Sequence, residues 1–331
     1  MRSMSSEVVV ITGASAGVGR ATARRFASAA ARIGLIARGR EGLEATAREI
    51  ERAGGRALVL PLDVADADAV DGAARQVEEE LGPIDVWINN AMATIFAPLA
   101  DVEPDEYRRA TEVTYLGTVW GTMAALRRMR RRNRGTIVQV GSALAYRGIP
   151  LQAPYCGAKH AIQGFTESLR TELLHDRSQV QVTLVHLPAH NTPQFEWGRS
   201  KMPRQPQPVP PIFQPEVAAE AIEYAAHHRR RQIYVAWPTV KAIFGNKVAP
   251  GVLDLILAKH GYDEQQTEEP AQPGRPDNLF EPVDSDRGPH GPFDGRSIDR
   301  SWLLWANLRR EWLGLAASAA LVGTALGRRR D

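Results

Sequence analysis

Short apolar runs alternate with amphipathic stretches along the first two thirds of the chain. The apolar runs are short and mostly non-alternating, as expected of strands buried on both faces. They cover Val8–Thr12, Ile33–Ala37, Ala57–Leu60, Ile84–Ile88, Thr136–Val140 and Val180–His186. Helical patterns such as Gly19–Ala30 and Arg40–Ala53 lie between them. This alternation predicts an α/β fold in which right-handed crossovers join parallel strands of one sheet.

The last third of the chain is divided by its composition. Residues 188–215 are rich in proline with apolar residues interleaved, which favours a lid over a nonpolar pocket. Regular structure is predicted to resume with a helix at Glu216–His228 and a strand at Gln232–Val235, so the catalytic domain is expected to span 6–262. Residues 263–300 are polar and lack periodicity, which predicts an irregular and even disordered linker.

The C-terminal tail, residues 301–331, is apolar again. Its segment Trp312–Gly327 is shorter than the ~20 residues that a spanning helix usually needs. Tryptophans at 302, 305 and 312 are typical of a membrane interface. Two interpretations stay open: a membrane-associating helix, or packing onto the protein's own surface or a subunit partner.

Composition narrows the class of protein only slightly. The chain has 331 residues, a net charge of +3 and a pI of about 9.1, which does not by itself indicate nucleic acid. The single cysteine, Cys156, cannot form an internal disulfide, and no signal peptide is recognisable at the N-terminus. We therefore expect a cytoplasmic protein, with membrane association through the tail as the alternative. The arginine-rich run 127–134 is interpreted as a helix C-terminus, and binding of anionic lipid or nucleic acid is the competing hypothesis.

A glycine-rich turn follows the first predicted strand. Its sequence, Thr12-Gly13-Ala14-Ser15-Ala16-Gly17-Val18-Gly19, leads directly into a predicted helix. Glycines let the backbone approach phosphates, and a helix N-terminus offers free N–H groups and a positive dipole. The turn therefore predicts a pyrophosphate site. The candidate contacts are Gly13, Ser15, Ala16, Gly17, Val18 and Gly19.

The ends of the next strands bear on which nucleotide is bound. The second strand is followed by Arg38 with no carboxylate, and a guanidinium suits the 2′-phosphate of NADP better than the ribose diol of NAD. The alternative is that Arg38 is a solvated surface residue. Asp63, followed by Val64, is a candidate acceptor for the adenine amino group, and Asn89 is expected to line the crevice.

A serine, a tyrosine and a lysine provide candidate acid–base chemistry. Tyr155 and Lys159 are one helical turn apart, and Ser142 lies upstream of both. A fixed ammonium favours the phenolate and lowers a tyrosine pKa that is normally about 10. This spacing is weak evidence alone, because many helices carry it by chance. Its position after the nucleotide motifs favours a catalytic group.

Together these residues resemble the short-chain dehydrogenase/reductase family. The matching motifs are TGASAGVG at 12–19, LDV at 62–64, NNA at 89–91, Ser142 and YCGAK at 155–159, over roughly residues 6–245. The resemblance implies a Rossmann-type doubly wound parallel sheet with helices on both faces, here with a C-terminal extension. It also implies hydride transfer between a nicotinamide cofactor and a carbonyl or alcohol. In it Tyr155 exchanges the proton, Lys159 tunes the tyrosine and binds the nicotinamide ribose, and Ser142 holds the substrate oxygen.

The sequence departs from the family pattern at two places. Thr114 stands where an asparagine is usual, at a position whose backbone carbonyl helps to hold a water of the proton relay. Thr114 is therefore a candidate member of that relay. The usual Pro-Gly segment is Pro188-Ala189 here and looks one residue shorter before Thr192, a candidate contact of the nicotinamide amide. His190 in this segment is either an active-site residue or an ordinary loop histidine.

The sequence therefore predicts an NADP-dependent oxidoreductase, with NAD as the less favoured cofactor. Its expected partners are a small, lipophilic carbonyl or alcohol substrate and further copies of itself, and no metal site and no nucleic acid are predicted. Thr114 and the altered Pro-Ala segment motivate the alternative of an inactive nucleotide-binding regulatory or scaffold protein.

Overall fold

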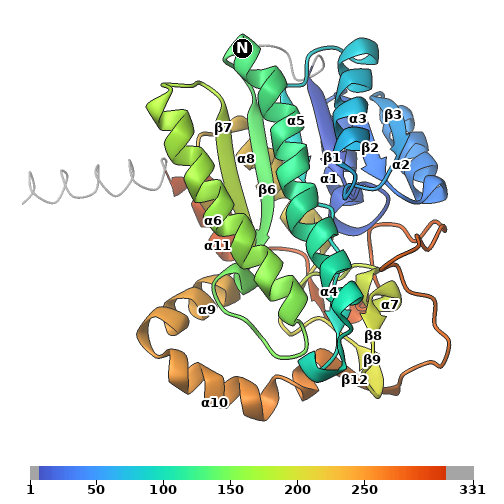
Figure 1. The fold of residues 1–331 in the computed structure, drawn as a ribbon, viewed down its shortest axis with the longest axis vertical. Coiled ribbons are helices and arrows are strands. Elements are labelled where there is room, and N and C mark those ends of the chain that lie inside the picture. The colour runs from blue at the N-terminus through green and yellow to red at the C-terminus, as the bar shows by residue number, and fades with distance from the viewer. Residues whose placement is uncertain (1–6, 311–331) are drawn as a thin grey trace, which may run out of the picture.

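A seven-stranded parallel sheet forms the centre of the protein (Figure 1). This computed structural model describes residues 7–310. The strand order is β3-β2-β1-β4-β6-β7-β11, and every pairing in the sheet is parallel. The strands are β1 (Val8–Thr12), β2 (Arg32–Ala37), β3 (Arg56–Pro61), β4 (Val86–Asn89), β6 (Thr136–Ser142), β7 (Gln181–Leu187) and β11 (Gln232–Tyr234). The predicted α/β fold is confirmed.

Helices cover both faces of the sheet. Two hydrophobic clusters, one on each face, assign α1, α2 and α8 to one face and α3, α5 and α6 to the other. Their bounds are α1 (Gly17–Ala27), α2 (Arg40–Arg52), α3 (Ala67–Glu80), α5 (Gly117–Arg132), α6 (Ala153–His175) and α8 (Pro215–His227). This arrangement is the doubly wound, Rossmann-type architecture.

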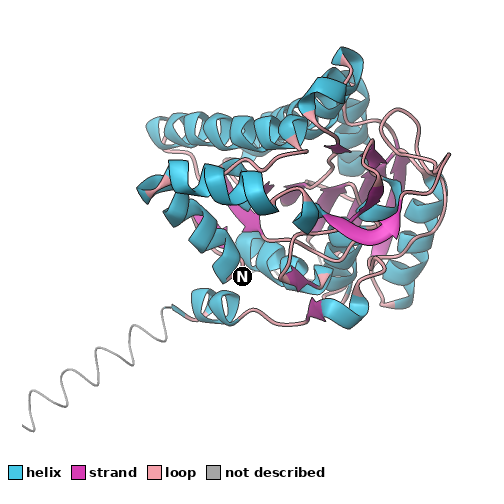
Figure 2. Ribbon diagram, turned by 90° about the horizontal axis from the view of Figure 1, so that it is seen from below, coloured by secondary structure: helices cyan, strands magenta, loops and turns pink. Residues whose placement is uncertain are grey.

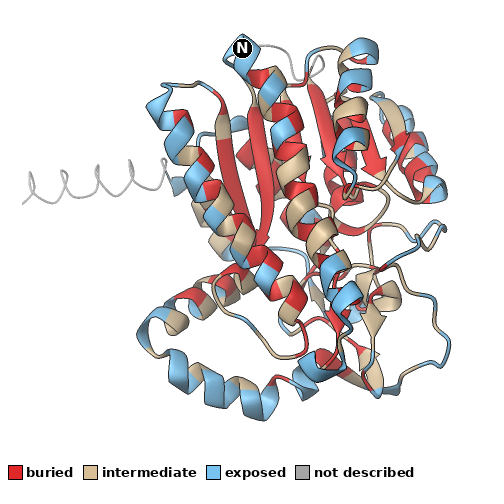
Figure 3. Cartoon of the chain, in the orientation of Figure 1, coloured by how far each residue is buried: buried red, intermediate tan, exposed pale blue. Residues whose placement is uncertain are grey.

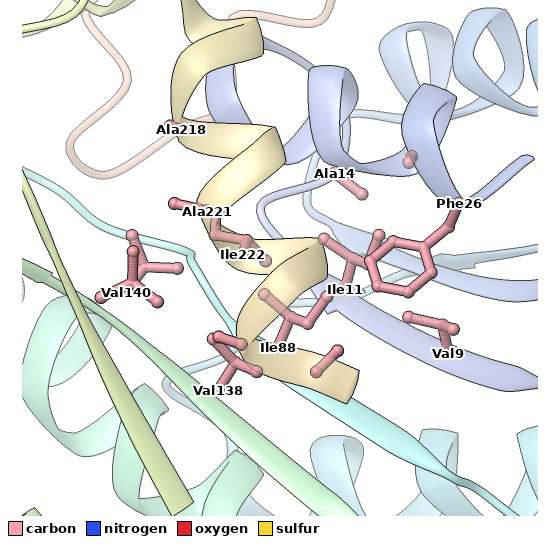
Figure 4. Packing of buried hydrophobic residues seen from close by; sticks show 14 of the residues in the cluster. Val9, Ile11, Ala14, Phe26, Ile88, Val138, Val140, Ala218, Ala221 and Ile222 are labelled. Atoms are coloured by element: carbon pink, nitrogen blue, oxygen red, sulfur yellow. The ribbon is translucent and has the colours of Figure 1, made fainter. Parts of the chain in front are cut away.

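Apolar side chains of the central strands are buried because helices pack on both sides of them. Figure 4 shows Ile11 and Ile88 of the sheet against Phe26 of α1 and Ile222 of α8. All four are completely inaccessible to solvent. Full burial of such a side chain contributes about 1.5–3 kcal/mol to the free energy of unfolding. This layer therefore holds the strand ends, and the residues that follow them, in fixed positions.

The arginine-rich run 127–134 closes α5 and is tied to neighbouring carboxylates. Arg128 pairs with Asp71, and Arg132 pairs with Glu78. The helix then ends at Asn133, which adopts the left-handed conformation at φ 46°. The run thus stabilises contacts between α5 and α3, which agrees with its interpretation as a helix C-terminus.

The proline-rich segment is held down by three short strand pairs. Its helix α7 (Gln194–Trp197) and its strands β8 (Arg199–Ser200), β9 (Arg204–Pro206) and β10 (Ile212–Phe213) follow one another along the chain. These strands pair with β5 (Ile95–Phe96), β12 (Gln266–Pro270) and β13 (Ser297–Ile298) respectively. Two of the three partners belong to the polar segment 263–300, which is irregular over most of its length but packs on the domain through these pairs.

The remaining helices lie at the lower end of the molecule and beside the sheet edge (Figures 1 and 2). They are α4 (Pro104–Thr111), α9 (Trp237–Val248), α10 (Pro250–His260) and α11 (Trp302–Leu308). Within residues 7–310 no helix is both long enough and apolar enough to cross a membrane. The tail segment Trp312–Gly327, on which the sequence-based membrane hypothesis rests, lies outside the described residues.

Candidate active site

One continuous cavity of about 460 Å³ opens at the carboxyl ends of the sheet strands. At one end it is lined by the glycine-rich turn, and at the other by Ser142, Tyr155 and Lys159. Open parallel sheets bind ligands at this edge, where the strand order reverses. Residues that are more than 140 positions apart in the sequence therefore face a single space.

The glycine-rich turn fits a pyrophosphate. A Cβ at Gly19 would lie 2.1 Å from the carbonyl oxygen of Gly13, and Gly17 has a φ of +55°, so neither position accepts a side chain easily. Helix α1 begins after Ala16, which makes no side-chain cap. The first-turn N–H groups are consequently not capped by a side chain and lie beside the cavity, where an anion is favoured. Gly13, Ser15, Ala16, Gly17 and Val18 all line the cavity.

Ser142, Tyr155 and Lys159 meet at the other end. Ser142 is the last residue of β6, while Tyr155 and Lys159 lie in the first two turns of α6, which begins after Gln152 with Pro154 in its first turn. The Lys159 Nζ lies 5.4 Å from the centre of the Tyr155 ring and donates to the carbonyl oxygen of Val140 at 2.7 Å. The sequence-predicted group is thus assembled in space.

Burial controls the protonation of this group. It raises the pKa of Tyr155 to about 12, against the opposing effect of a hydrogen bond with Ser142. It lowers the pKa of Lys159 to about 8. Both changes have the same cause, because a buried site disfavours the charged form of either side chain, and the lowering of the Tyr155 pKa expected from Lys159 is not found. At neutral pH the phenol is therefore protonated and the lysine is largely an ammonium.

Arg38 and Asp63 line the cavity where β2 and β3 end, on the side of the glycine-rich turn. Asp63 forms an ion pair with Arg109 and accepts from the backbone N–H of Ala65 at 3.0 Å. Burial and the nearby Arg109 guanidinium lower the pKa of Arg38. Both side chains therefore line the cavity but already have protein partners, and their contacts with adenine and with a 2′-phosphate stay predictions.

A segment near the C-terminus crosses this end of the cavity. Residues 278–288, which we call the strap, are bound by Arg38 through the backbone carbonyls of Asn278, Leu279 and Phe280. Asp284 accepts from the backbone N–H of Glu41 at 2.9 Å, and Gly288 accepts from the N–H of Gly17 at 3.2 Å. The strap contributes five residues to the cavity lining, Asn278, Pro282, Val283, Asp284 and Ser285.

Three predicted site residues, Gly19, Asn89 and Thr114, lie outside the cavity lining. Asn89 is buried, where its amide donates to Thr122 and Gln139, and its neighbour Asn90 lines the cavity instead. Thr114 is fully buried in a π-helical turn, and its hydroxyl is bonded to both the N–H and the carbonyl of Ala93. The Thr114 carbonyl accepts from the Thr118 hydroxyl at 2.9 Å, so its relay function stays a prediction.

Thr192 and His190 also line the cavity, and Thr192 lies next to Gly17 of the glycine-rich turn. His190 Nδ1 lies 2.9 Å from the carbonyl oxygen of Pro188, which requires Nδ1 to carry the proton. Its Nε2 is then an acceptor, and it is buried without a hydrogen-bond partner among residues 7–310. Burial also lowers the pKa of His190 to about 4, so the ring is neutral at physiological pH.

The strap and Asn90 were not identified from the sequence. Strap residues occur in an irregular polar stretch without any motif, and only folding brings them to the nucleotide motifs. Asn90 follows the last residue of β4, and the alternation of side chains along a strand indicates only that Asn89 and Asn90 do not both face the crevice, without showing which of them does. In the described part of the chain, no three or more His, Cys, Asp or Glu side chains cluster as metal ligands would.

Comparison with known proteins identifies the family. Residues 7–202 match the model of the family described as short chain dehydrogenase. The chain is 32% identical to the uncharacterized oxidoreductase YxnA of Bacillus subtilis, over 99% of this chain and 92% of that protein. It is 30% identical to dehydrogenase/reductase SDR family member 7B of Bos taurus, over 78% of this chain and 83% of the relative.

A solved structure agrees with these relatives. The crystal structure of a metagenomic short-chain oxidoreductase in complex with NADP superposes with a TM-score of 0.59 at 28% identity. The match covers 70% of this chain and 98% of the other. The strap lies outside the family-model match, which ends at residue 202.

Proposed function

The chain belongs to the short-chain dehydrogenase family and is an NAD(P)-dependent oxidoreductase, and we propose that it interconverts a carbonyl and an alcohol with Tyr155 as the proton donor and acceptor. The observation that supports this most directly is the single cavity shared by the glycine-rich turn and the Ser142–Tyr155–Lys159 group. A dinucleotide extended along it would carry its reactive ring to the phenol.

The protonation states suit carbonyl reduction. A bound nicotinamide cofactor supplies the hydride, and the protein supplies the proton. As the carbonyl oxygen gains negative charge, the Tyr155 phenol transfers its proton to that oxygen while the Ser142 hydroxyl donates a hydrogen bond to it. The resulting phenolate is stabilised by the Lys159 ammonium, and oxidation of an alcohol runs through the reverse steps.

We further propose NADP as the preferred cofactor. Arg38 lines the cavity where β2 ends, and β2 is followed by no carboxylate of its own. The NADP in the metagenomic relative supports this preference. The strap opposes the preference for NADP in two ways. Its carbonyls accept hydrogen bonds from Arg38, and Asp284 adds a negative charge near Gly39.

We propose a lipophilic substrate on the basis of the lining near the catalytic group. Apolar side chains from the proline-rich segment and its surroundings border that part of the cavity. They are Leu144, Ile149, Phe195, Val209, Pro210 and Pro211. Such a surface favours a molecule with a hydrocarbon body and one polar reacting group.

The test is an assay of the full-length protein with NADPH and a panel of aldehydes, ketones and secondary alcohols of increasing hydrophobicity. We expect oxidation of NADPH with at least one carbonyl and higher kcat/KM for the more hydrophobic members. Cofactor binding without turnover across the whole panel would instead favour the inactive regulatory or scaffold alternative that Thr114 motivates.

A further inference from the structure

Helices α9 and α10 form a hairpin that projects from the body of the molecule (Figure 1). The two helices pack on one another where Leu253 lies close to Gly245. Figure 3 shows α10 exposed along most of its length, and none of its residues is buried. A helix in this position gains little from the protein core, so its apolar residues require another explanation.

Large apolar side chains follow one face of α9. Phe244 follows Trp237 by seven residues and Val248 follows it by eleven. At 100° per residue, the three side chains therefore lie within about 40° of one another around the helix axis. Phe244 is 67% exposed, and the other two are similarly accessible. On α10, Val252, Leu255 and Ile256 are also exposed. The hairpin therefore exposes six large apolar side chains, three on each helix, which is more than the singly scattered apolar side chains of an ordinary protein surface.

Positive charge flanks this surface. Lys241 and Lys247 lie about 60° to either side of Phe244 on α9, and Lys259 lies one turn beyond Leu255 and Ile256 on α10. All three lysines are exposed. The hairpin's one carboxylate, Asp254, is paired with Arg147. Apolar residues flanked by lysines are typical of helices that lie in the interface of an anionic bilayer, where each lysine contributes about 1 kcal/mol.

The hairpin also borders the active-site cavity. Pro238, Thr239 and Ala242 of α9 line the cavity, while Trp237 and Phe244 of the same helix face outward. A surface that holds α9 would therefore be separated by that helix alone from the cavity that contains Tyr155.

We propose that the α9–α10 hairpin docks the protein on an anionic membrane surface. Phe244, Leu255 and their apolar neighbours enter the boundary between headgroups and acyl chains, and the three lysines contact lipid phosphates. The cavity wall formed by α9 then lies next to the lipid phase. This surface is separate from the apolar tail at 312–327, so the two can be distinguished by substitution in the full-length chain.

The experiment measures sedimentation of the full-length protein with phosphatidylcholine vesicles that contain or lack phosphatidylglycerol. Wild-type protein is expected to bind the anionic vesicles more strongly. The double variant Phe244→Ser/Leu255→Ser and the variant Lys241→Glu/Lys247→Glu are each expected to weaken that binding at least about tenfold. The matched control is Leu174→Ser, whose side chain on α6 is 71% exposed and remote from the hairpin, and it should bind as wild type does.

Three outcomes would overturn the proposal. They are failure of the wild-type protein to bind either vesicle, unchanged binding by both hairpin variants, and loss of self-association rather than of vesicle binding in the serine variant. The second would assign membrane binding to another part of the chain, and the third would assign the surface to a second copy. Circular dichroism and turnover of a water-soluble carbonyl by the variants exclude misfolding as the cause of any loss.

Discussion

Arg38 has two roles open to it, and they predict different effects of substitution. If it binds a 2′-phosphate, Arg38→Leu removes charge-assisted hydrogen bonds worth about 1.5–3 kcal/mol and weakens NADPH binding roughly tenfold to a hundredfold. NADH binding should then change much less. Titration of both cofactors by fluorescence or calorimetry measures the difference.

The control for this substitution is Arg40→Leu, because Arg40 is two residues away and its side chain is 62% exposed. Equal weakening of NADPH and NADH in Arg38→Leu would contradict the phosphate role. It would show instead that Arg38 acts through the strap carbonyls that it binds.

His190 makes the stability of the protein depend on pH. Its pKa is lowered to about 4 in the folded protein, against about 6.5 for an unfolded chain. Between these values the unfolded chain binds a proton that the folded protein does not. The contribution of neutral His190 to the free energy of unfolding is therefore fully present above about pH 6.5. It is lost progressively as the pH falls toward 4. At pH 5 the loss amounts to about 2 kcal/mol.

Urea unfolding at pH 7.5 and pH 5.0 tests this prediction. In His190→Leu the difference in unfolding free energy between the two pH values should be smaller than in wild type by about 2 kcal/mol. The exposed histidine His175 provides the control, since His175→Leu should leave the wild-type difference in place. Buried His186, whose pKa is also lowered to about 4, should account for part of the pH dependence that remains in His190→Leu.

At the scale of elements, the strap joins the C-terminal extension to the nucleotide site. Leu279 is completely buried in the hydrophobic cluster under α3 and α5, and it anchors the strap. Leu279→Ala should cost about 2–4 kcal/mol locally and release the strap. Because five strap residues line the cavity, we expect the cofactor Kd to rise several-fold.

Limited proteolysis between residues 270 and 300, together with the cofactor Kd, measures both effects. Leu174→Ala is the matched control, because it removes the same side chain from an exposed site on α6. A strap that becomes sensitive to protease while cofactor affinity stays at the wild-type value would show that the strap covers the site without contributing to binding.

The elements differ in how well the sequence predicts them. Central strands such as β1 and β6 were predictable, because burial on both faces requires a continuous apolar run and the following glycine turn or serine marks its end. Strands β9, β12 and β13 were not predictable. Each has two to five residues, and their pairing depends on chain segments about 60 to 85 residues apart, which no local pattern encodes.

At the scale of the whole molecule, the sequence predicted a catalytic domain, an irregular linker and an apolar tail. The structure gives the polar segment 263–300 a more integral position, because it pairs with the proline-rich segment and contributes the strap. Polar composition predicted few apolar contacts there, and the segment is held by backbone hydrogen bonds, by ion pairs such as Arg20–Asp286 and by a few buried apolar side chains such as Leu279. Homo-oligomer formation and a cytoplasmic location stay predictions.

The catalytic assignment of Tyr155 is tested most directly by comparing turnover of wild-type protein and Tyr155→Phe with the best carbonyl substrate of the panel. General acid catalysis contributes about 10²–10⁴-fold, so kcat of the variant should fall by that factor or more. The Kd for NADPH should stay within about twofold of wild type, because the phenol oxygen acts on the substrate. Turnover by Tyr155→Phe within tenfold of wild type would contradict the account.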